Sequence, residues 1–201
     1  MREHHSYQWR LSSASNARIF DEETLTAIRN VKRDNRLIAG SNRGHAIMVF
    51  DGGTVEHVIP SNLVIECKRF DWFWWGDADQ LRINLIRRSE IDPNINKSIK
   101  RSIGTIRNIF IRVVFARGFG GCIIHANTKP MLDDITLDNV RLEIIGDDNS
   151  PLQHGQSAIF IGNATNLRLK VFSTHWELPV AENFFSAPMV ENIHGLTLGG
   201  V

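Results

Sequence analysis

Apolar and polar residues alternate in short runs along the chain, and this two-residue period predicts β-strands with one buried face. When four such runs are aligned, one column holds Asn35, Asn62, Val113, Asn139 and, from the run "NLRL", Asn166. Asparagine tolerates a left-handed φ and bonds to nearby backbone, so this column predicts a tight turn between two short strands. The flanking apolar positions, expected to face the core, include Val55, Val58, Pro60, Leu63, Ile65, Ile106, Ile109, Ile111, Val114, Ala116, Leu132, Ile135, Leu137, Val140, Leu142, Leu167 and Leu169.

The members of this column are 27, 51, 26 and 27 residues apart. Self-similarity at such a period predicts a solenoid, and the doubled interval leaves room for one additional turn. A leucine-rich repeat and a parallel β-helix both fit the period. Isoleucine and valine dominate the apolar positions and glycine breaks the linkers. The pattern therefore favours an all-β fold, a right-handed single-stranded parallel β-helix of about six to seven coils.

The pattern divides the chain into an irregular N-terminal extension, residues 1–24, and one solenoid domain, residues 25–201. Residues 89–104 are polar and contain a proline, so they are expected to form a loop excursion. The segment "DEETLTAI" from Asp21 is either a helical turn capped by Asp21 or a loop. The last recognisable coil keeps the apolar register through Val190, Ile193 and Leu198.

Composition and charge narrow the range of partners. The chain has 201 residues, 42% of them hydrophobic, and its 23 basic residues nearly balance 22 acidic ones. This balance gives no electrostatic footprint for nucleic acid. Neither a signal peptide nor an apolar run of membrane-spanning length is visible, so no membrane partner is expected. Cys67 and Cys122 lie beside apolar runs and are expected to be small buried hydrophobes, with no metal or cofactor; a disulfide between them stays open.

The stretch "RFDWFWWGDAD", residues 69–79, concentrates three of the five tryptophans. On a strand, Trp72 and Trp74 would share one face and Trp75 the other, so one core cannot bury all three. One interpretation is a sugar-binding groove in which the tryptophans stack on sugar rings and neighbouring arginines meet acidic groups. The other is a core segment whose outward aromatic residues lie under a loop or against a partner.

Two carboxylates in this stretch, Asp77 and Asp79, are the candidates for a catalytic pair. On a strand they would face the same way, about 7 Å apart, which suits an inverting glycosidase. A solvated acidic turn is the alternative that the local sequence favours. His45 and His125 occupy comparable positions beside loops, where a hydrogen-bonded structural role is the more common one.

Several stretches, residues 27–66, 74–79, 104–121 and 132–144, resemble the central-to-late coils of glycoside hydrolase family 28, the polygalacturonase-like pectin-degrading enzymes. The resemblance covers roughly residues 25 to 200. It implies a parallel β-helix that hydrolyses pectin or another uronate-containing polysaccharide through paired carboxylates, without a cofactor. The relatives are often extracellular or periplasmic. Taken with the aromatic stretch and the basic residues near it, the candidate substrate-binding residues are Trp72, Trp74, Trp75, Arg43, His45, Arg69 and Arg87.

The family's Asn-Thr-Asp, catalytic Asp-Asp, Gly-His-Gly and Arg-Ile-Lys motifs are not found in this chain. Ala46, Ile47 and Met48 stand where Arg-Ile-Lys is expected, and Arg43 is the nearest cation that can substitute. The resemblance therefore implies the C-terminal half of such an enzyme, or a relative without its catalytic residues. Three hypotheses follow: a truncated hydrolase, a non-catalytic carbohydrate-binding solenoid, or a structural fragment that self-associates through an open β-helix end.

Overall fold

The computed structural model describes residues 16–19, 27–70, 78–88, 94, 103–119, 121–127, 132–145, 157–177 and 186–200. Within them the fold is all-β, and every strand pairing is parallel. The predicted all-β fold of parallel strands is thus confirmed. The strands are β1 (Asn16–Ile19), β2 (Ala27–Ser41), β3 (Arg43–Phe50), β4 (Thr54–Cys67), β5 (Asp79–Ile86), β6 (Thr105–Gly118), β7 (Cys122–Ala126), β8 (Leu132–Ile144), β9 (Ser157–Trp176) and β10 (Ser186–Gly199).

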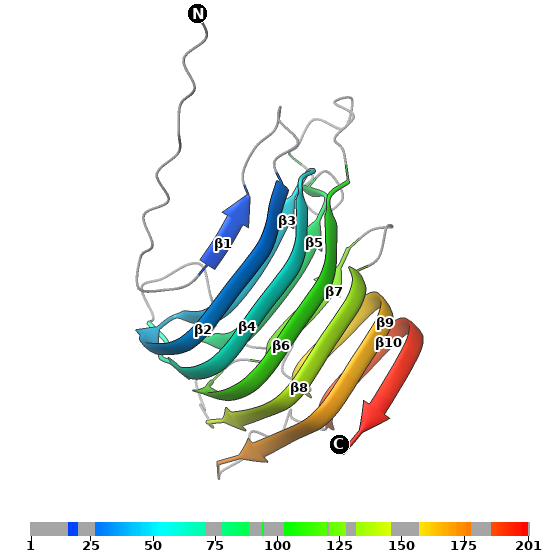
Figure 1. Cartoon of the computed structure of the whole chain (residues 1–201). Coiled ribbons are helices and arrows are strands. Elements are labelled where there is room, and N and C mark those ends of the chain that lie inside the picture. Colours follow the sequence, from blue (N-terminus) through cyan, green and yellow to red (C-terminus); the bar gives the residue numbers. More distant parts are fainter. Residues whose placement is uncertain are drawn as a thin grey trace, which may run out of the picture.

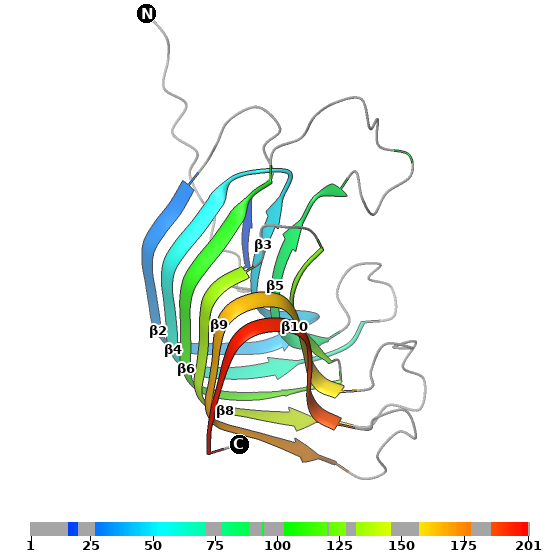
Figure 2. The same cartoon turned by 90° about the vertical axis from the view of Figure 1, so that its right-hand side faces the viewer.

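The ten strands form one sheet that winds back on itself. Its order is β1-β3-β5-β7-β9-β8-β6-β4-β2, with β10 paired to β9. The first part of β9 continues the side formed by β3, β5 and β7, and its second part continues the side formed by β4, β6 and β8. In Figure 1 the long strands lie in register along the molecule, and Figure 2 shows β9 and β10 arching from one side to the other. The core therefore lies between the two sides.

The long strands share two corners, and the residue at each of them has a left-handed φ; β9 and β10 have a third such residue, Asn163 and Asn192. The first corner and the second corner are five residues apart in every long strand. A left-handed residue turns the backbone without ending the strand, because ladder pairing resumes on both sides of it. The corner pairs, with φ between 49° and 79°, are Asn30/Asn35, His57/Asn62, Asn108/Val113, Asp134/Asn139, Asn166/Val171 and Gly195/Gly200.

The predicted asparagine column is confirmed as the second corner at Asn35, Asn62, Val113 and Asn139, but the prediction is wrong for Asn166. The β8–β9 register sets Asn166 opposite Asp134, at the first corner. Both corners are followed by inward apolar residues at the next position and two further on, so the local sequence "NLRL" fits either one. Leu167 and Leu169 consequently continue the columns of Ile135 and Leu137, and both are buried.

The additional turn predicted from the doubled interval is also wrong. β4 pairs directly with β6, with Val58 beside Ile109, so no strand on that side intervenes between them. The interval instead contains β5, which pairs with β3 and β7 on the other side, and two long connections. The helical or loop segment from Asp21 to Thr26 and most of the 89–104 excursion lie outside the described residues.

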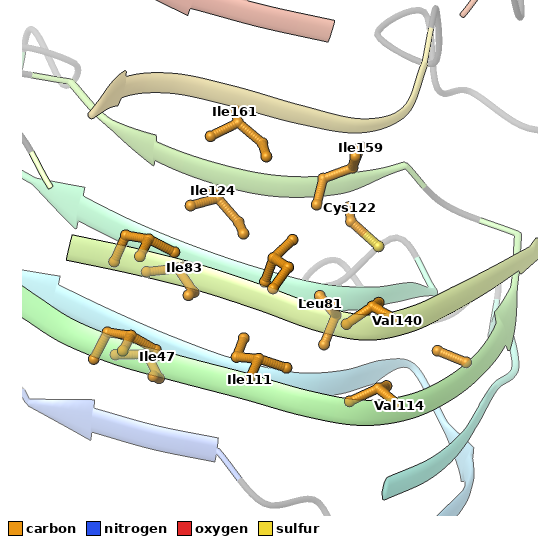
Figure 3. Packing of buried hydrophobic residues seen from close by; sticks show 14 of the residues in the cluster. Ile47, Leu81, Ile83, Ile111, Val114, Cys122, Ile124, Val140, Ile159 and Ile161 are labelled. Carbon is orange, nitrogen blue, oxygen red and sulfur yellow. The ribbon is translucent and has the colours of Figure 1, made fainter. Parts of the chain in front are cut away.

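Inward side chains of neighbouring strands stack in columns and form one core. Figure 3 shows one such column, Ile47, Ile83, Ile124 and Ile161, together with residues of the opposite side such as Ile111. Every member of this cluster is less than a tenth exposed. Cys67 and Cys122 are buried free thiols, as expected from their apolar neighbours, and burial raises the pKa of the Cys122 thiol to about 12.

Candidate functional site

The strands β3, β5 and β7, with the first parts of β9 and β10, carry a second set of side chains that point away from the core. We call this surface the outer face. Because side chains alternate along a strand, its residues occupy the positions between the core positions. Two rows cross the strands there: Ala46, Arg82, Ile123, Phe160 and Met189 in one, and Met48, Asn84, His125, Gly162 and Glu191 in the other.

At the β3–β5 end of the outer face, two arginines share one carboxylate. Arg43 Nε lies 3.2 and 3.1 Å from the two carboxylate oxygens of Asp79. Arg82 Nε donates to Asp79 Oδ2 at 2.8 Å. Arg43 Nη1 also contacts Met48 Sδ at 3.6 Å, so its guanidinium lies along the outer face. We call this group the Arg43–Asp79–Arg82 cluster.

This cluster is buried, and it brings two cations to one carboxylate. The Asp79 side chain is 0% exposed, and those of Arg43 and Arg82 are 8% and 12% exposed. A solvated acidic turn, the interpretation that the local sequence favoured for Asp79, is therefore wrong for this residue. Removing one partner of such a buried ion pair typically costs about 3–5 kcal/mol of stability.

Further along the second row, His125 is held by Asn163. Asn163 Nδ2 lies 3.2 Å from His125 Nε2 and donates to the Ala126 carbonyl oxygen at 2.6 Å. Gly162 makes room for the imidazole ring, because a Cβ there would lie 2.7 Å from His125 Cδ2. Phe160 packs against the same ring at 5.6 Å between centroids. Partial burial lowers the pKa of His125, and the carboxylate of Glu191 opposes this shift.

Asn84 lies between these two groups. It pairs in register with Met48 on one side and with His125 on the other. Its side-chain oxygen, Oδ1, is buried and has no hydrogen-bond partner, which is uncommon for a buried polar atom. The second row therefore places a buried amide oxygen and a half-buried imidazole side by side, next to the Arg43–Asp79–Arg82 cluster.

The structure separates the two histidines that the sequence treats as equivalent. His45 points into the interior at the first position of the Leu81–Cys122 column, whereas His125 lies on the outer face. His45 is 2% exposed and neither ring nitrogen has a hydrogen-bond partner, contrary to the expected hydrogen-bonded role. Burial and the nearby Arg33 charge lower its pKa to about 4. This position gives no support to a sugar-binding role for His45.

The other predicted site residues are scattered. Arg69 lies half-buried beyond the end of β4, and Arg87 lies half-buried beyond the end of β5. The backbone at Arg87 is fixed by Asn127, whose Oδ1 accepts from the Arg87 amide at 2.9 Å. Of the predicted residues, the structure brings Arg43 and Asp79 together. Trp72, Trp74, Trp75 and Asp77 lie outside the described residues.

The sequence interpretation missed Arg82, Asn84 and Asn163. The alternation of "DQLRINLI" carries the signal for the first two, since Leu81, Ile83 and Leu85 take the core positions and leave the polar residues on the other face. Asn163 has no comparable signal, because it lies at a bend where β9 passes from one side of the sheet to the other with φ 54°.

Carboxylates are few on the outer face within the described part of the chain. The two on this face are Asp79, which is buried between arginines, and Glu191, which is exposed on β10. The described residues contain no cluster of three or more side chains able to hold a metal ion, and none of their helices could cross a membrane. Comparisons with protein families, curated proteins and solved structures gave no significant match to this chain.

Proposed function

We propose that the chain is a right-handed single-stranded parallel β-helix related to the polygalacturonase-like hydrolases, and that its outer face binds an acidic polysaccharide. The Arg43–Asp79–Arg82 cluster carries this proposal. Its two guanidinium groups, beside the amide of Asn84 and the imidazole of His125, suit a uronate carboxylate flanked by hydroxyl groups.

The strand order and the corners support the β-helix. Each passage of the chain adds one strand to either side of the sheet, and the inward columns run through all of them. We propose six coils, one for each pair of corners, at the lower end of the expected six to seven.

We propose binding without hydrolysis for this chain on its own. Glycosidases of the implied kind need two carboxyl groups that both reach the substrate. Asp79 is enclosed by two guanidinium groups and has no exposed surface, so it is a poor candidate for either role. This argument favours the carbohydrate-binding hypothesis over the truncated hydrolase.

Affinity electrophoresis in gels containing polygalacturonate or a neutral glucan tests the proposal. The chain should be retarded by polygalacturonate alone, and a reducing-sugar assay on the same polymer should detect no cleavage. Arg82→Gln should weaken the retardation about tenfold, because it removes a charge-assisted contact while leaving the Arg43–Asp79 ion pair in place.

Arg112→Gln is the matched control, since Arg112 is a cation on β6, on the other side of the sheet. It changes the net charge by the same amount and should leave the retardation unchanged. Equal weakening in both variants would show that binding depends only on the net charge of the chain, and it would contradict the outer-face site. Cleavage that disappears in Asp79→Asn, with an unchanged melting temperature, would restore the hydrolase hypothesis.

A further inference from the structure

At the β2 edge of the sheet, the last residue of two core columns is an arginine. Among the described strands, β2 pairs with β4 alone, so no described strand lies along its other edge. Its inward positions continue the columns of β4, with Val31 beside Val58 and Ile38 beside Ile65. Between these two apolar positions, Arg33 stands beside Pro60 and Arg36 beside Leu63. Cations thus occupy positions that apolar residues fill in the next two strands, Pro60 and Ile111 in one column and Leu63 and Val114 in the other.

Arg33 and Arg36 have no acidic partner within the described residues. Arg33 Nη1 is buried without a hydrogen-bond partner. Burial and the neighbouring Arg36 both lower the pKa of Arg33. Asp34, the acid between them in sequence, lies on the opposite face, where its Oδ1 accepts from the Ser61 hydroxyl and the Asn62 amide at 3.0 and 2.7 Å.

His45 adds a second, independent observation at the same end. Its imidazole begins the neighbouring inward column, is fully buried, and leaves both ring nitrogens without a partner. A buried polar group without a partner is costly, and this end holds two such side chains, Arg33 and His45.

A second copy of the chain does not complete this end. Two β2 edges brought together would oppose arginine to arginine. A β10 edge would set Leu198 in the column of Arg33, and the other inward residues of β10, Val190, Ile193 and Leu196, are apolar too. Burying a cation against apolar side chains costs several kcal/mol.

We propose that the edge of β2 away from β4 binds an extended acidic polypeptide segment, which adds as a further parallel strand and places two carboxylates against Arg33 and Arg36. Backbone pairing along the edge supplies affinity, and the carboxylates supply selectivity. The register predicts their spacing. Arg33 and Arg36 are three positions apart with a corner between them, so the segment should read Asp/Glu-x-Asn/Gly-Asp/Glu, with the third residue in the left-handed conformation.

A peptide built from β4 tests this prediction, because β4 already has the length and corner spacing of the required strand. The probe is residues 54–67 with Pro60→Glu, Leu63→Glu and Cys67→Ser, and its matched control carries glutamine at the two glutamate positions. Fluorescence anisotropy with the whole chain should show the glutamate peptide binding at least about tenfold more tightly than the glutamine peptide, with the difference shrinking at high salt. Equal affinities, or no binding of either peptide, would overturn the proposal.

Variants of the whole chain assign the effect to the two arginines. Arg33→Gln with Arg36→Gln should abolish the preference for glutamate, while Arg33→Lys with Arg36→Lys should retain most of it. Thermal melting of both variants verifies that they fold, and a preference that survives the glutamine variant in a folded chain contradicts the site. Sedimentation of the unmodified chain tests whether a second copy binds at the β2 edge. Self-association that the glutamine variant abolishes would assign the edge to another copy and overturn the proposal.

Discussion

The β2 and β10 ends of the sheet present the same columns of inward positions, but they fill them with different residues. At the β10 end the columns finish in Val190, Ile193, Leu196 and Leu198, and Leu198 is 57% exposed. At the β2 end, the columns next to Pro60 and Leu63 finish in arginine. The columns themselves require apolar side chains only where another strand covers them. The identity of the terminal residue therefore indicates what kind of surface each end can accept.

The largest expected effect is on the free energy of unfolding, and it compares a covered position with an uncovered one in the same column. Ile135 in the middle of the sheet is 0% exposed, whereas Leu196, two strands further along the same column, is 41% exposed. Ile135→Ala should lower the free energy of unfolding by about 3–4 kcal/mol, because it leaves a cavity that the neighbouring strands cannot fill. Leu196→Ala should cost less than about 1 kcal/mol.

Urea denaturation of both variants measures this difference. Equal losses would mean that the β10 end is covered in solution, which would remove the contrast between the two positions.

The second prediction concerns the β2 end and its pH dependence. The pKa of His45 is about 4 in the folded chain, below its ordinary value of 6.5. Between these values the unfolded chain binds a proton that the folded chain does not, so stability rises with pH. Up to about 3 kcal/mol, fully present above pH 6.5, should be lost as the pH falls towards 4.

Unfolding free energies measured from pH 4 to 7 provide the test. His45→Leu, which matches Leu81 in the same column, should flatten this part of the profile. An unchanged slope in that variant would assign the pH dependence to other groups.

Corners occur in the strands at both ends, and substitutions there have the smallest expected effect on the free energy of unfolding. A β-branched residue is strained at a left-handed φ, yet Val113 has φ 52° while Asn139 on the next strand has φ 54°. Val113→Asn should raise the free energy of unfolding by about 1 kcal/mol, and Asn139→Val should lower it by about the same amount. Thermal melting of the pair checks the sign; a loss in both variants would show that packing at the corner outweighs the backbone conformation.

Much of this fold follows from the sequence because each strand has a strict alternation and most corners carry an asparagine or glycine. The pattern located the inward positions of β4, β6 and β8 and placed the second corner at Val113, although valine is a poor residue for it. It failed where two corners share one local signature, as at Asn166. It also failed where a long interval contained connections instead of an additional turn.

The candidate site was less accessible to sequence interpretation, since it depends on which strands become neighbours. Arg43 and Asp79 are 36 residues apart and meet only because β3 pairs with β5. The burial of His45 depends on the same pairing, because an isolated "SNRGHAI" does not indicate which side of the strand faces the core. Strand neighbours in a solenoid are fixed by connection lengths, and these vary more than the strands do.

The constant spacing of the corners determines where the chain can take up additional residues. Each pair of corners is five residues apart, whereas the steps from one first corner to the next range from 26 to 51 residues. Within this chain, the variation in length therefore lies in the connections, while the spacing of the corners is constant. The connection between β5 and β6 is the natural place to splice in a foreign segment, because its length is already decoupled from the framework that carries it.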